Sequence, residues 1–183
     1  MLTLCGIVIG NAMTALLTHP AVLDEVVMMA LVKATRAGIE GKSSMDQWPG
    51  YAHERISLMR FIADRKIPNP VVLTGDIHSN WANELRIDDR EHDTPVVATE
   101  LVGTSISSGG NGIEKPDYLD SMKAANPVVK FHTQERGYVR CTLTPAQMRA
   151  DYVAVEDVLR PGGKVLTRAS FVIESGRPQL NPA

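Results

Sequence analysis

Two side chains that commonly bind metal ions stand two positions apart, just after an apolar run. Residues 71–74 read Val-Val-Leu-Thr, and Gly75 then leads into Asp76, with His78 following. Carboxylate oxygen and neutral imidazole nitrogen are both good ligands for divalent metals, and one short turn can direct both into one pocket. We interpret the pair as half of a metal site. In the alternative interpretation, Asp76 caps a turn and His78 is a hydrogen-bonded histidine at the edge of the core.

The elements that must position this pair are a buried strand and the helices around it. The run 71–74 has the character of a buried strand, and open α/β sheets bind ligands beyond the carboxyl ends of such strands. Upstream, Pro49 is expected to open a helix that continues through Arg65. A helix, a short turn and an all-apolar strand in succession favour a sheet covered by helices. The side chains expected on the inner face of this helix are Tyr51, Ile56, Met59 and Ile62.

The rest of the chain predicts an earlier helix and a series of strands. Residues 21–37 have apolar side chains at spacings of three and four, acids near the start and bases near the end, which predicts a helix. Downstream we expect strands over 81–87 and 95–102, a small-residue loop over 103–112, a short helix around 116–125, and an antiparallel meander of strands 138–143, 151–158 and 165–174.

Composition limits the class of protein. The chain has 183 residues, 44% of them hydrophobic and 22% charged, which fits one globular domain with a core. The net charge is −2 and no cluster of lysine and arginine indicates a nucleic-acid surface. The apolar stretch 2–17 has no basic residues before it and is shorter than the ~20 residues of a spanning helix. We therefore expect a buried strand or loop there, with neither a membrane span nor a signal peptide. Two cysteines do not fix the compartment.

The glycine- and serine-rich loop 103–112 lacks the motifs of two common enzyme classes. No Gly-Lys-Ser/Thr sequence follows it, so binding of a nucleoside triphosphate is unsupported. A Gly-x-Ser-x-Gly elbow for a serine nucleophile is also absent. We interpret the loop as the rim or lid of a site.

Several motifs, in the same order along the chain, resemble those of the alkaline phosphatase D (PhoD-like) family. The segment 75–81 resembles the family's G-D-x-H-x-x-W motif, and Asp46 to Tyr51 followed by Glu54-Arg55 resembles D-x-W-D-G-Y…R, with Pro49 in place of the second aspartate. The other matching segments are Ala98–Ile106, Arg136–Val139, Ala169–Glu174 and Gly176–Pro178. The family is much longer, so the resemblance implies that residues 1–183 are the C-terminal portion of its domain, without the N-terminal half.

The resemblance implies an α/β fold, namely a partial calcineurin-like metallophosphoesterase sandwich of helix-flanked β-sheets with a C-terminal antiparallel meander. It implies metal-dependent hydrolysis of phosphate monoesters and diesters by metal-activated water. Asp76 and His78 would bind metal and act in catalysis. Ca²⁺ and Fe³⁺ are the ions that the family implies, while Zn²⁺ and Mn²⁺ also suit these donors.

The candidate substrate-binding residues are Arg55, Asn80 and Trp81. Arg55 could contact phosphate bidentately, or could equally be a solvated arginine on a helix face. Trp81 could form the wall of a pocket or only pack. The expected partner is a small phosphate ester. A competing hypothesis is that the chain is catalytically incomplete and serves as a structural or interaction half, as a homodimer or with a complementing chain. The family is often exported to the periplasm or cell surface, but the sequence of this chain does not give its location.

Overall fold

The computed structural model describes residues 2–5, 22–24, 27–35 and 39–183, which form two five-stranded sheets and few helices. One sheet is mixed, with strand order β2-β3-β5-β4-β6, and the other is antiparallel, with order β1-β7-β8-β9-β10. The mixed sheet contains β2 (Val22–Asp24), β3 (Val71–Thr74), β4 (Asn80–Leu85), β5 (Ala98–Val102) and β6 (Val129–Thr133). The antiparallel sheet contains β1 (Leu2–Cys5), β7 (Gly137–Leu143), β8 (Gln147–Val155), β9 (Val165–Glu174) and β10 (Asn181–Pro182).

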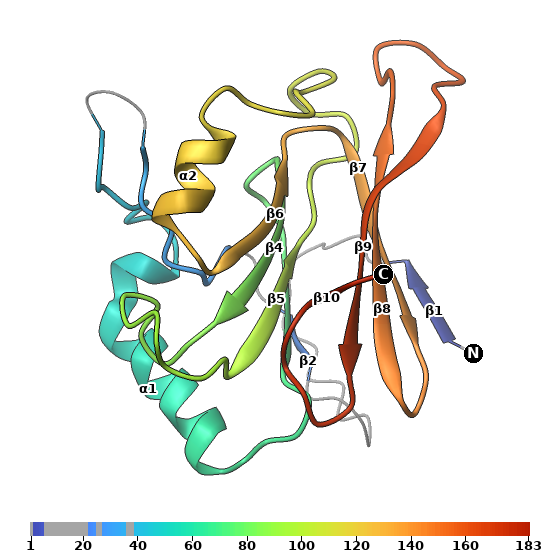
Figure 1. Ribbon diagram of the computed structural model, residues 1–183. Coiled ribbons are helices and arrows are strands. Elements are labelled where there is room, and N and C mark those ends of the chain that lie inside the picture. The colour runs from blue at the N-terminus through green and yellow to red at the C-terminus, as the bar shows by residue number, and fades with distance from the viewer. Residues whose placement is uncertain (1, 6–21, 25–26, 36–38) are drawn as a thin grey trace.

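The molecule has three layers, which Figure 1 shows side by side. The helices α1 (Ala52–Asp64) and α2 (Leu119–Ala125) lie over one face of the mixed sheet, and the antiparallel sheet lies over the other. One core lies between helices and sheet, around Met59, Val72 and Met122. A second lies between the two sheets, around Leu101 and Tyr152. Val71, Val72 and Leu73 of β3 point alternately to the two cores, which is why all three are apolar.

Most predicted elements are present. A 3₁₀ turn, η1 (Trp48–Tyr51), with Pro49 near its start, runs directly into α1, so the helix predicted from Pro49 is confirmed. Met59 and Ile62 are buried in it as expected, whereas Tyr51 is 62% exposed, so its predicted inward position is wrong. Strand β6 was not predicted, although its Val-Lys-Phe-His-Thr sequence alternates. In the part of the chain that the structure describes, no helix is long and apolar enough to cross a membrane.

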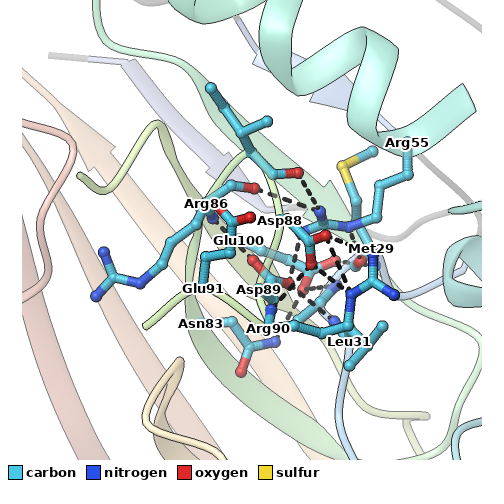
Figure 2. Close-up of polar contacts among 12 residues, drawn as sticks. Met29, Leu31, Arg55, Asn83, Arg86, Asp88, Asp89, Arg90, Glu91 and Glu100 are labelled. Carbon is cyan, nitrogen blue, oxygen red and sulfur yellow. Dashed lines mark hydrogen bonds and ion pairs between the residues drawn. The ribbon is translucent and has the colours of Figure 1, made fainter. Parts of the chain in front are cut away.

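The helix predicted over residues 21–37 is wrong. Val22–Asp24 forms a strand parallel to β3, and the described residues 27–35 contain no helix. Distant side chains replace the helical hydrogen bonds in the segment 28–34: the Glu100 carboxylate accepts from the N–H groups of Met29 and Ala30, and Asp89 accepts from that of Leu31. Figure 2 shows Met29 and Leu31 beside these two acids. Of the apolar stretch 2–17, only Leu2–Cys5 is described, as strand β1, and the remainder lies outside the described residues.

Candidate metal-binding edge of the mixed sheet

Asp76 and His78 lie on one tight turn between β3 and β4. Both side chains are exposed, and both residues have left-handed backbone conformations, with φ of 65° for Asp76 and 52° for His78. The turn is closed by a hydrogen bond from the Ile77 N–H to the Gly75 carbonyl at 2.8 Å. Left-handed conformations are uncommon outside glycine, though aspartate and histidine adopt them more often than most residues. Such strain persists where the surrounding structure enforces it, and it is frequent at functional sites.

Three other segments meet this turn at the same edge of the mixed sheet. Strand β5 is parallel to β3 and ends beside it, and the Gly103 N–H donates to the Thr74 carbonyl at 2.9 Å. Strand β4 is antiparallel to both β5 and β6, so its first residue, Asn80, lies beside Thr133 at the end of β6. The carboxyl ends of β3, β5 and β6 therefore converge with the start of β4. This edge is where a sheet of this kind binds ligands.

Asn80, predicted to bind substrate, has its amide occupied by the protein. It is 2% exposed, its Nδ2 donates to the Glu135 carbonyl at 3.1 Å, and its Oδ1 accepts from the Thr104 N–H at 3.3 Å. Asn80 thus joins the start of β4 to the loop after β5 and to the segment after β6.

Trp81, also predicted at the site, packs just beneath the turn. Its Nε1 donates to the Ser79 hydroxyl at 2.7 Å, and its ring stacks on His132 with centroids 3.7 Å apart. His132 Nδ1 is bonded to the Asn80 carbonyl at 3.0 Å, and its Nε2 lies 3.2 Å from the Tyr118 hydroxyl. Burial lowers the pKa of His132 to about 4. This histidine is therefore a neutral part of the support for the edge.

Arg55 is a buried residue of α1 and lies away from this edge. It is 2% exposed, so the solvated alternative is wrong. Its guanidinium is bonded to Asp89 and to the Met29 carbonyl at 2.8 Å, which Figure 2 shows. It also donates to the Ile87 carbonyl at 3.1 Å. Each of its three nitrogen atoms therefore has a protein acceptor. The structure gives no support for a phosphate contact at Arg55.

Glu100 is a buried acid that sequence reasoning missed. It is fully buried in β5, and burial raises its pKa to about 7, against the lowering effect of the hydrogen bonds that it accepts from Met29, Asn83 and Ala30. The only signal in the sequence was an acid inside an apolar strand. Its contacts indicate a structural role, because they fix the segment 28–34 onto the mixed sheet.

A cleft lies next to the turn, on the helix-covered face of the mixed sheet. Its lining includes the side chains of Ile77, Trp81 and Met122 and those of Lys33, Lys42 and Gln134. Ile77 stands between the two predicted ligands, so the cleft adjoins the turn. Trp81 therefore forms the wall of a cleft as well as packing in the core.

The comparisons with known proteins place this geometry in a family. The family model described as PhoD-like phosphatase matches residues 15–152, which include the Asp76–His78 turn and its supports. The chain belongs to the PhoD-like phosphatase family. It is 44% identical over 137 residues to alkaline phosphatase D of Bacillus subtilis (strain 168), a match that covers 75% of this chain and 24% of that protein. A solved structure described as the structure of PhoD is similar with a TM-score of 0.81 and 39% identity, over 88% of this chain and 31% of the other.

The donors on this PhoD-like chain fit part of a metal site. Among the described residues, no group of three or more histidine, cysteine, aspartate or glutamate side chains is placed to hold an ion. Asp76 and His78 supply a carboxylate and an imidazole, which suit several metals, but a closed site takes four or more ligands. The chain spans about a quarter to a third of the length of the relatives that it matches.

Proposed function

We propose that this chain forms part of the active site of a metal-dependent phosphoric ester hydrolase that acts on small phosphate monoesters and diesters. The observation that carries the proposal is the exposed Asp76–His78 pair on a hydrogen-bonded turn, at the carboxyl edge of the mixed sheet in a PhoD-like chain. In this proposal the Asp76 carboxylate and the His78 imidazole are metal ligands.

When bound, the metal would polarise the phosphoryl group and make bound water a nucleophile at neutral pH. The residues of this chain hold and orient the ligands. The buried Asn80 and Trp81 fix the start of β4 beneath the turn, and Trp81 also forms the wall of the adjoining cleft. Arg55 has no part in this proposal, because its donors are already used in the protein. For the metal, Ca²⁺ and Fe³⁺ follow from the family, and Zn²⁺ and Mn²⁺ suit the same donors.

The proposal includes the place of this chain in a larger unit. We infer that residues 1–183 correspond to the C-terminal portion of a calcineurin-like sandwich, and that another segment or chain completes the ligand set. The short coverage of the two relatives and the two-ligand turn support this inference. The same observations favour a second candidate function, in which the chain has no catalytic activity alone and is the structural or interaction half of such a phosphatase.

The experiment is a measurement of metal content and of hydrolysis of a chromogenic phosphodiester. We compare the wild-type chain with the double variant Asp76→Ala plus His78→Ala. The matched control is His92→Ala plus Asp93→Ala, an exposed acid and histidine in the loop between β4 and β5. We expect the wild type and the control to retain bound metal and the Asp76/His78 variant to lose it, because only that variant lacks the proposed ligands.

The outcomes separate the two candidate functions. Metal binding with turnover, both lost in the Asp76/His78 variant, would show that the chain completes a site, for example across a homodimer. Metal binding without turnover would support the second candidate function, in which the chain has no catalytic activity alone. A folded wild-type chain that binds no metal would contradict the assignment of Asp76 and His78 as ligands on this chain.

A further inference from the structure

Arg136 connects three separate segments at the metal-binding edge. It follows β6 and is 5% exposed. Its Nη1 donates to the His78 carbonyl and to the hydroxyls of Thr104 and Ser105, both at 3.1 Å, and its Nε donates to the Gly110 carbonyl at 2.8 Å. The guanidinium thus contacts the turn that carries the proposed ligands. It also contacts the small-residue loop 103–112 at two places, residues 104–105 and residue 110.

The contact with the His78 carbonyl bears directly on the direction of the His78 side chain. His78 has a φ of 52°, a conformation that a residue with a side chain does not favour. A hydrogen bond from a charged donor is shorter and stronger than one between neutral groups. Holding the carbonyl fixes the peptide plane after His78, which restricts rotation about ψ and so limits the directions open to the Cα–Cβ bond of this residue. The guanidinium therefore compensates for an unfavourable backbone state at a residue that, as a ligand, needs a fixed orientation.

The surrounding segments have a second set of connections that does not use the Arg136 side chain. Asn80 binds the Thr104 N–H and the Glu135 carbonyl, and the Gly137 N–H donates to the Ser105 carbonyl at 3.2 Å. Loss of the guanidinium would consequently loosen the turn while the sheet edge stays connected.

We propose that Arg136 is the positioning residue of the Asp76–His78 site, which it holds in the ligand-ready conformation without touching metal or substrate. This inference rests on the proposed function, because it assumes that Asp76 and His78 bind a metal. It assigns to Arg136 the role that outer hydrogen-bond partners of metal ligands have in general, where their removal weakens metal binding by about 10- to 100-fold.

The test measures the affinity of the purified chain for Mn²⁺ and for Zn²⁺, each added alone, by calorimetric titration. The thermal unfolding midpoint of each variant is measured as well. We expect Arg136→Met to weaken binding by about 10- to 100-fold at a temperature at which it is folded. Arg136→Lys should be intermediate, because one ammonium group cannot reach the carbonyls of both His78 and Gly110. Added guanidinium, below concentrations that affect stability, should restore part of the affinity of Arg136→Ala.

The control variant is Arg149→Met, which removes an arginine that pairs with Asp151 on the antiparallel sheet. It should leave the metal affinity unchanged. If the wild type binds metal and Arg136→Met binds it equally well, the positioning role is overturned while the proposed function stands. If Arg136→Met does not fold, Arg136→Lys decides, and wild-type affinity in that variant overturns the inference. If the wild type binds neither ion, the proposed function fails and this inference fails with it.

Discussion

At the scale of single residues, His132 shows how the core supports an exposed turn. Its Nδ1 lies 3.0 Å from the Asn80 carbonyl, which can only accept, so this nitrogen carries the proton of the neutral ring. Its Nε2 can then accept from the Tyr118 hydroxyl. The ring is 3% exposed and stacks on Trp81, and burial lowers its pKa from 6.5 to about 4. A protonated ring would lose the Tyr118 contact and gain an unpaired charge.

This lowered pKa predicts a loss of stability in acid. The unfolded chain binds a proton at His132 below pH 6.5 and the folded chain only below about 4, so stability falls as the pH is lowered between these values. The full loss is about 3 kcal/mol, at about 1.4 kcal/mol per pKa unit. We expect the free-energy difference between wild type and His132→Asn, from urea unfolding, to shrink from pH 7 to pH 4.

The wild type must be compared with the variant at each pH because the titration of Glu100 changes the stability of the fold in the opposite direction. Its pKa is raised to about 7, so its contribution to stability is lost as the pH rises towards and through that value. Exposed His92→Asn is the control variant. A wild-type minus His132→Asn difference that stays constant with pH would contradict the neutral, buried state of His132.

Also at the scale of single residues, the sequence predicted the turn that carries Asp76 and His78 but did not predict the burial of Arg55. The turn follows from an apolar strand that ends in glycine, which is a local pattern. The burial of Arg55 depends on Asp89, 34 positions away, and on backbone carbonyls from two other segments. A pattern along one helix carries no information about such partners, so a buried arginine and a phosphate-binding one have the same sequence signature.

At the scale of elements, the segment 28–34 is held by side chains from other parts of the chain. Glu100 and Asp89 accept from its first N–H groups, and Asn126 binds both the N–H and the carbonyl of Lys33, at 2.7 and 2.9 Å. These partners lie 58 to 93 positions away. The apolar spacing of residues 21–37 was that of a helix, but distant acceptors supplied other partners for its backbone. Strand β3 and helix α1 were predictable because apolar spacing and Pro49 mark them locally.

Asn126 is the part of this arrangement that is simplest to test. Asn126→Leu keeps the side-chain volume and removes both bonds to Lys33 together with the bond to the Met122 carbonyl at 2.8 Å. Because it leaves part-buried polar groups without partners, we expect a loss of about 2 kcal/mol in the free energy of unfolding. Urea unfolding measures it, with the exposed Asn181→Leu as control. Equal stability of the two variants would contradict a stabilising role for these contacts.

At the scale of the whole molecule, the two sheets pack face to face around a largely apolar core. The Tyr152 side chain crosses this interface from β8, and its hydroxyl donates to the carbonyl of Trp81 in β4. The same side chain lies beside Phe131 of the mixed sheet, with ring centroids 4.9 Å apart. Tyr152 is 1% exposed, and its hydrogen bond links the antiparallel sheet to the strand that begins at the proposed metal-binding edge.

Removal of this hydroxyl tests how much the bond between the sheets contributes. Tyr152→Phe keeps the ring contacts, so we expect only the hydrogen-bond contribution to be lost, about 1 kcal/mol in the free energy of unfolding. Chemical denaturation of both proteins gives the difference. Tyr138→Phe on β7, where the side chain is only half-buried, is the matched control and should change stability less. A Tyr152→Phe variant as stable as the wild type would contradict a net contribution from the bond.

The stacked pair of Trp81 and His132 also gives the chain an optical property. The sequence contains two indoles, at Trp48 and Trp81, and the Trp81 indole lies flat against an imidazole while its N–H is bonded to Ser79 of the ligand turn. We expect a movement of the turn to change the emission of this indole, because its N–H is bonded to Ser79 and its ring is stacked on His132. The protein carries its own unlabelled reporter, positioned directly beneath Asp76 and His78.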